Sequence, residues 1–147
     1  MTDTLFLFTL VAGTPVAVRA SEIEAVVRLG EVVPIPLAPP HVRGLAALRS
    51  RVLTVIHMET QIFGKARGDA PAIFAIVAEI GGHSYAFCVD ALSDICHAQG
   101  GVLPVQGRID AAWAPFAGGL VEREGQSHLL LTLADFIAGS GSAARAA

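Results

Sequence analysis

Short apolar runs, each ended by glycine or proline, limit this chain to a small fold built from strands. Residues 5–11 form the first run, and the turn residues 13–15 end it. Residues 16–19 then place valine at every second position, the period of a strand with one buried face. Runs of this length at this spacing are typical of a small barrel or sandwich, so we predict an all-β fold.

Three strand pairs are predicted from the turns between them. The pairs are residues 45–48 with 52–56, 72–80 with 85–89, and 117–122 with 129–132. Gly81-Gly82 joins the second pair, and such a doublet favours a two-residue hairpin. Short helices are predicted at residues 58–63 and 133–138. Ser21 with Glu24 predicts a capping box for one more helical turn.

Two segments are predicted to connect these elements rather than belong to a sheet. Four prolines lie between residues 34 and 40, and each removes a backbone donor, which makes this segment a stiff connector. Residues 64–71 are expected to separate two subdomains of a single domain that spans residues 1–138. The small, polar residues 139–147 favour a flexible tail.

The composition leaves too few charged side chains to cover the surface. Of the 147 residues, 53% are hydrophobic and 16% are charged, whereas soluble domains average about 25% charged. A membrane-spanning helix needs about 20 consecutive apolar residues, and the longest apolar stretch is much shorter than that. We therefore expect exposed apolar patches that protein partners cover.

Charge and cysteine content exclude further classes. The net charge is −3 and no basic stripe is present, which argues against nucleic-acid binding. The first residues lack the positive region of a signal peptide, and we expect no direct insertion into a membrane. The only cysteines, Cys88 and Cys96, show no disulfide framework. We expect a cytoplasmic protein.

Sequence motifs for catalysis are weak, and we predict no enzyme activity, no metal and no cofactor. Phosphate-binding glycine loops and nucleophile elbows are absent from the sequence, and no two of the five histidines are spaced i, i+4. The alternative is a small barrel enzyme that uses Cys96 with His97, or Asp90. Neighbouring residues on a strand point to opposite faces, which argues against the Cys96–His97 pair.

One segment is more specific than the rest. Residues 44–58, GLAALRSRVLTVIHM, resemble the signature of the CheW family, a strand ending in Asn-Leu-Arg-Gly followed by a Pro-Val-Ile-Asp-Leu strand. Three further blocks agree with the family in order and spacing, and the resemblance covers about residues 5–138. They are Val33-Pro-Ile-Pro36, Val89-Asp-Ala-Leu-Ser-Asp-Ile95 and Gly119-Leu-Val121.

The resemblance implies a fold and a function. It implies two intertwined five-stranded SH3-like barrels with a hydrophobic groove between them, one from residues 14–66 and the other from residues 5–13 and 67–138. Members of the family are adaptors of chemotaxis and two-component signal transduction that carry no cofactor. They link the regulatory domain of a CheA-type histidine kinase to the cytoplasmic tip of chemoreceptors, which recruits them to receptor arrays at the membrane.

The resemblance also implies binding residues. Those expected in the receptor-binding groove are Phe6, Ala20, Ile23, Leu92 and Arg49. Those expected on the kinase-facing surface are Val42, Leu45 and Arg49. Each has an alternative role in ordinary packing or, for Arg49, as a solvated charge in a turn.

Four residues depart from the family signature: Ala47 replaces Asn, Ser50 replaces Gly, Thr54 replaces Pro and His57 replaces Asp. Ser50 is the most consequential, because glycine there permits a positive φ that serine disfavours. We therefore expect a reshaped turn around Arg49. A divergent adaptor that serves another kinase pathway, or that has lost one partner, is the alternative within the family.

Overall fold

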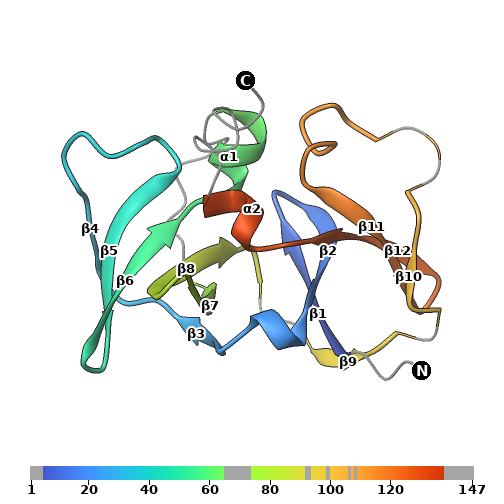
Figure 1. Cartoon of the computed structure of the whole chain (residues 1–147), viewed down its shortest axis with the longest axis horizontal. Coiled ribbons are helices and arrows are strands. Elements are labelled where there is room, and N and C mark those ends of the chain that lie inside the picture. Colours follow the sequence, from blue (N-terminus) through green and yellow to red (C-terminus); the bar gives the residue numbers. More distant parts are fainter. Residues whose placement is uncertain are drawn as a thin grey trace.

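The computed structural model describes residues 5–64, 74–91, 94–98, 100–105, 107 and 109–137, which form two curled β-sheets side by side (Figure 1). The strands are β1 (Leu5–Val11), β2 (Thr14–Arg19), β3 (Ala25–Arg28), β4 (Val32–Val33), β5 (Val42–Leu48), β6 (Arg51–Ile56), β7 (Phe74–Ile80), β8 (His83–Val89), β9 (Ile95–His97), β10 (Val102–Leu103), β11 (Ala117–Arg123) and β12 (Gln126–Leu131). The helices are η1 (Ala20–Glu22), α1 (Met58–Phe63) and α2 (Ala134–Ile137). No helix in the described part of the chain is long and apolar enough to cross a membrane.

Each sheet forms one lobe. Lobe A has the strand order β10-β11-β12-β2-β1-β9, and lobe B has the order β3-β7-β8-β6-β5-β4. The predicted all-β, intertwined fold is confirmed, because the N-terminal hairpin β1–β2 joins strands from the C-terminal part of the chain. Within the described residues each sheet has six strands rather than the five expected. The additional strands are short edge strands of two to four residues.

The lobe boundaries differ from the prediction. Lobe B takes the continuous stretch from β3 to β8, and lobe A takes β1 and β2 together with β9 to β12. The predicted barrels, 14–66 and 5–13 with 67–138, would separate β1 from β2 and β6 from β8. Instead, β1 and β2 are an antiparallel hairpin paired along six residues. The parallel pairs β2–β12 and β6–β8 then decide which lobe each hairpin joins.

The two lobes repeat one pattern of strands and registers. Leu129 pairs with Val16 in lobe A in the way that Thr54 pairs with Tyr85 in lobe B. The hairpin β11–β12 therefore corresponds to β5–β6, and β1–β2 corresponds to β7–β8. In each lobe the strand beside the short edge strand carries a bulge, at Gly119 in β11 and at Gly44 in β5. Any position in one lobe can thus be compared with its equivalent in the other.

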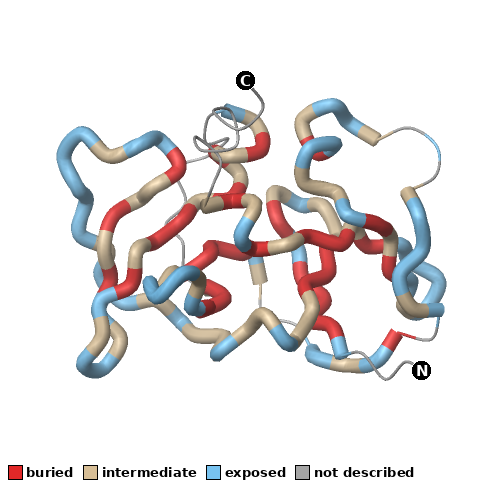
Figure 2. The backbone as a smooth tube through the Cα atoms, in the orientation of Figure 1, coloured by how far each residue is buried: buried red, intermediate tan, exposed pale blue. Residues whose placement is uncertain are grey.

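A shared core joins the lobes. Figure 2 shows buried segments in both lobes and in the C-terminal segment that runs between them. The largest buried cluster combines residues of lobe A, among them Leu7 and Leu131, with Phe87 of lobe B, and it also includes Trp113 and Phe136. Buried apolar area is the main source of folding free energy, so this cluster holds the two lobes together as one unit.

Several local predictions have a clear outcome. The 3-10 helix η1 begins at Ala20, so the predicted capping box from Ser21 to Glu24 is wrong. Glu24 instead accepts hydrogen bonds from Arg51. The hairpins at residues 49–50, 81–82 and 124–125 are confirmed. Most of the predicted subdomain boundary, residues 65–71, and the predicted tail, 139–147, lie outside the described residues.

Candidate functional site

An exposed apolar surface covers the outer side of lobe B at β4, β5 and β6. Val33 pairs with Leu45, and Ala47 pairs with Val52, so these side chains share one face of the sheet. Val33 is 55% exposed and Val52 is 62% exposed. We call the surface formed by Val33, Leu45, Ala47 and Val52 the β4–β6 face. It includes Leu45, one of the residues expected to contact the kinase.

The proline-rich connection extends this apolar surface. It follows β4 directly and exposes Ile35 and Leu37, and Leu37 is fully exposed with a positive φ of 65°. A fully exposed leucine contributes nothing to the core of its own chain, and contiguous apolar surface marks interaction sites. Val42, the second residue expected to contact the kinase, is half-buried against the shared core.

Arg49 lies at the tip of the β5–β6 hairpin, at the lower left of Figure 1, and its side chain is exposed. Its φ is 57°, whereas Ser50 does not have a positive φ. The expectation that Ser50 would need the positive φ is therefore wrong, because Arg49 adopts it instead. The free-energy cost of the left-handed backbone conformation therefore arises at Arg49 rather than at Ser50.

The guanidinium of Arg51 is held in place by hydrogen bonds, and sequence reasoning missed this residue. Its two terminal nitrogens bind both carboxylate oxygens of Glu24, at 3.1 and 2.5 Å, and one lies 3.4 Å from Ser84 Oγ. The hydrogen bond from Arg51 lowers the pKa of the Glu24 carboxyl. This bidentate pair connects β6 to the segment before β3 and supports the hairpin that carries Arg49.

A second apolar surface lies on β9 and β1 at the edge of lobe A and extends to η1, which leads from lobe A to lobe B in the lower part of Figure 1. Leu5 pairs with His97 and Leu7 with Ile95, so Leu5 and Ile95 are diagonal neighbours on one face. Leu5 is 39% exposed and Ile95 is 47% exposed. Because Phe6 pairs with Arg19, Leu5 lies beside Ala20 at the start of η1. We call Ile95, Leu5 and Ala20 the junction row.

The predicted groove residues lie in different environments. Ala20 is half-buried in the junction row, and Ile23 is half-buried against the shared core. Phe6 is 1% exposed and packs inside lobe A, so its side chain offers no surface to a partner. Leu5, one residue earlier, holds the exposed position on the opposite face. Leu92 lies outside the described residues. Whether these residues bind a receptor stays a prediction.

The residues of the alternative enzyme site do not converge. Cys96 pairs with Phe6 and His97 pairs with Leu5, so their side chains leave β9 on opposite faces. Both carboxylate oxygens of Asp90 accept backbone hydrogen bonds, from Ala12 at 3.2 Å and from Gly13 at 2.7 Å. Asp90 thus closes the β1–β2 turn. Within the described residues no group of three histidine, cysteine or acidic side chains could hold a metal ion.

The two cysteines are expected to differ strongly in thiol reactivity. Burial raises the pKa of the Cys88 thiol to about 11, so about 0.1% of it is thiolate at pH 8. Cys96 is half-buried. We expect 5,5′-dithiobis(2-nitrobenzoate) to react with one thiol of the native protein and with the second only after unfolding in urea. The variant Cys96→Ser should show no native reaction, and comparable rates for both thiols would contradict the burial of Cys88.

Comparison with known proteins agrees with this architecture. The profile of the CheW-like domain matches residues 5–140. Among solved structures, the chain is similar to the scaffolding protein TtCheW from Thermoanaerobacter tengcongensis, with a TM-score of 0.69, 22% sequence identity and coverage of 89% of each chain. That likeness shows a common fold. The sequence matches no curated protein. Because the family profile extends over almost the whole chain, this protein belongs to the CheW-like domain family.

Proposed function

We propose that this protein is a non-enzymatic adaptor of bacterial signal transduction that couples a CheA-type histidine kinase to chemoreceptors. The observation that carries the proposal is the presence of two separate exposed apolar surfaces on one small fold, the β4–β6 face and the junction row. A chain with one such surface could bind one partner. Two surfaces on different sides of the molecule allow two partners to bind at once.

The β4–β6 face fits the kinase regulatory domain. Its apolar side chains lie on a rigid sheet, so little side-chain freedom is lost when they are buried. The exposed Arg49 at the hairpin tip gives the same side of the lobe a charged group for orientation. TtCheW, which has the same fold, is a scaffolding protein, and this supports a scaffolding role for this chain.

The junction row fits a helical partner such as the receptor tip. It combines the exposed Leu5 and Ile95 with the half-buried Ala20, and the half-buried Ile23 follows at the end of η1. Amphipathic helices bind such surfaces through apolar side chains spaced along one face of the helix. The protein would then act in the cytoplasm, at receptor arrays on the inner face of the membrane.

A bridging assay tests the proposal. The kinase regulatory domain is immobilised on beads, and capture of a soluble receptor-tip fragment is measured with and without this protein. We expect capture only when the protein is present. The substitution Ile95→Glu should weaken receptor capture about tenfold, because a carboxylate would be buried at the contact, and should leave binding to the kinase domain unchanged.

The assay also separates the alternatives. Binding of the kinase domain without receptor capture by the wild-type protein would mean an adaptor that has lost one partner. Failure to bind either protein would contradict the proposed coupling. Ser127→Glu, a new charge on the exposed side of β12, is the control and should bind both partners like the wild type.

A further inference from the structure

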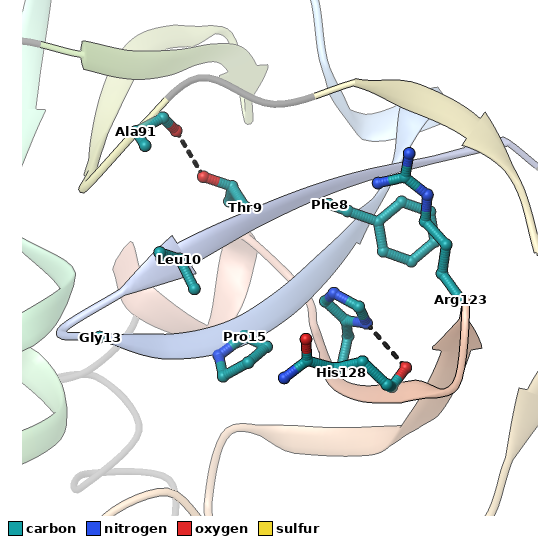
Figure 3. A pocket seen from close by; sticks show the side chains of 9 residues that line it. Phe8, Thr9, Leu10, Gly13, Pro15, Ala91, Arg123 and His128 are labelled. Atoms are coloured by element: carbon teal, nitrogen blue, oxygen red, sulfur yellow. Dashed lines mark hydrogen bonds between the residues drawn. The ribbon is translucent and has the colours of Figure 1, made fainter.

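Lobe A contains a cavity that lies apart from both apolar surfaces. It has a volume of about 430 Å³ and lies between the hairpins β1–β2 and β11–β12 (Figure 3). This volume is within the range of small-molecule sites. The residues that matter most are Arg123 and His128 on one side and Phe8, Leu10 and Pro15 on the other.

His128 is an unusual residue in this place because it is almost completely buried, with 9% exposed. Its Nδ1 lies 3.2 Å from the carbonyl oxygen of Gln126, and since a carbonyl only accepts, Nδ1 carries the proton. The ring is held edge-on against Phe8, with 4.8 Å between ring centroids. Nε2 is therefore left as the free nitrogen of the ring, and Figure 3 shows it directed into the cavity.

Arg123 supplies a positive charge at the same cavity. Its guanidinium carbon lies over the Phe8 ring, 5.3 Å from the ring centre, and this cation–π contact helps to hold the guanidinium in place. The nearest carboxylates, Asp94 at 3.7 Å and Glu124 at 4.0 Å, are 82% and 81% exposed. Ion pairs this long and this exposed contribute little free energy. An incoming carboxylate could therefore replace them at low cost.

The equivalent place in lobe B shows that the fold does not require these polar groups. By register, Leu48, Leu53 and Val77 of lobe B correspond to Arg123, His128 and Phe8 of lobe A. Leu53 and Val77 are fully buried and pack in one cluster. A buried imidazole costs free energy that a leucine does not, so lobe A keeps a polar pair where an apolar core would be the more stable choice.

We propose that this cavity binds a small organic acid. Its carboxylate would accept hydrogen bonds from the Arg123 guanidinium and, because Nδ1 of His128 already carries one proton, from Nε2 once the ring takes up a second proton on binding. Its short apolar body would lie against Leu10 and Pro15. Arginine is suited to carboxylates because its planar fork donates two parallel hydrogen bonds. The proposal rests on lobe A alone and is independent of the proposed coupling function. A free acid and the C-terminus of a peptide offer the same group.

Nuclear magnetic resonance titrations of the ¹⁵N-labelled protein test this site. The probes are butyrate, its neutral isostere butyramide, and the peptide N-acetyl-Gly-Gly-Val with a free C-terminus. We expect butyrate to shift the backbone amides of Leu10 and Arg123 and the ring nitrogens of His128 until saturation. Butyramide should cause no saturable shift. Saturation by the peptide but not by butyrate would assign the carboxylate to a peptide C-terminus.

Variants complete the test. Arg123→Gln should weaken butyrate binding at least tenfold, and His128→Leu, which installs the residue found in lobe B, should abolish it. The control is Arg28→Gln. Arg28 also lies over an aromatic ring, that of Phe74 in lobe B, 5.7 Å from its centre, but neither residue lines the cavity. This variant should bind butyrate like the wild type. Equal shifts with butyramide, or unchanged affinity in Arg123→Gln, would overturn the proposal.

Discussion

Replacing Gly44 by alanine is expected to destabilise the protein by about 3 kcal/mol or more. Gly44 has a φ of +147°, and a Cβ there would lie 2.1 Å from the carbonyl oxygen of Val33 and 2.7 Å from its carbonyl carbon. Both atoms belong to the backbone of β4, so no side-chain rotation can relieve the clash. The substitution must push β4 away from β5 and break the pairing of Val33 with Leu45.

The free energy of unfolding can be followed in urea through the fluorescence of Trp113, the only tryptophan, which lies in the shared core. Gly30→Ala is the control, because a Cβ at Gly30 meets nothing within 4 Å and its φ is not positive. That variant should stay within about 0.5 kcal/mol of the wild type. Equal unfolding midpoints for the two variants would contradict the close approach of β4 and β5.

The variant Gly119→Ala tests whether the equivalent glycine of lobe A matters as much for the free energy of unfolding as Gly44 does in lobe B. Gly119 has a φ of +154°, and a Cβ there would lie 2.7 Å from Val102 Cγ1 and 2.9 Å from the carbonyl oxygen of Leu103. The closest atom belongs to a side chain that can rotate, and the backbone atom is farther away than at Gly44. A destabilisation smaller than that of Gly44→Ala follows from this difference.

The strands and hairpins could be predicted from the sequence because their signals are local. The alternation of apolar residues and the turn residues at Gly81-Gly82 and Glu124-Gly125 are contained within about fifteen residues of chain. The distribution of hairpins between lobes could not be predicted in this way. It depends on the parallel pairs of β2 with β12 and of β6 with β8, and partners far apart in sequence leave no local pattern.

Which face of a strand is buried was the second feature that the sequence could not predict. Residues 5–11 are apolar at almost every position, so period two shows which side chains share a face but not which face is buried. The structure buries Phe6 and Phe8 inside lobe A and Leu7 in the shared core, which leaves Leu5 at the exposed end. The exposed residue is therefore Leu5, one position before the predicted Phe6.

The repetition of the two lobes also escaped sequence reasoning. The equivalent hairpins have Gly44-Leu45 and Gly119-Leu120 in common, but most other equivalent positions differ in residue type. Register and bulges are properties of the backbone, and many side chains satisfy them. The differences between lobes are therefore informative. They place the exposed valine at Val52, where lobe A has Ser127, and the cavity at His128, where lobe B has Leu53.

Replacing Val52 by glutamate is expected to weaken binding of the kinase regulatory domain about 100-fold. Val52 is 62% exposed at the β4–β6 face, and its cross-strand partner Ala47 is exposed as well. In the complex the new carboxylate would be buried among apolar side chains without a partner, which costs about 2–5 kcal/mol. A factor of 100 in affinity corresponds to about 2.8 kcal/mol, within this range.

The fold should tolerate this substitution, because Val52 contributes little to the core. We expect the free energy of unfolding to change by no more than about 0.5 kcal/mol, whereas the dissociation constant measured by isothermal titration calorimetry should rise. Ser127→Glu puts the same charge at the equivalent position of lobe A. It lies opposite Glu122, so a loss of a few tenths of a kcal/mol in stability is expected there.

The pair of variants separates a specific surface from a general effect of charge. If Ser127→Glu weakens kinase binding as much as Val52→Glu, net charge rather than the β4–β6 face controls the interaction. If neither variant changes affinity, the kinase binds elsewhere on the protein. Only a loss confined to Val52→Glu fits direct docking on lobe B. That loss should also persist at high salt, since it arises from an unpaired buried charge rather than from long-range repulsion between exposed groups.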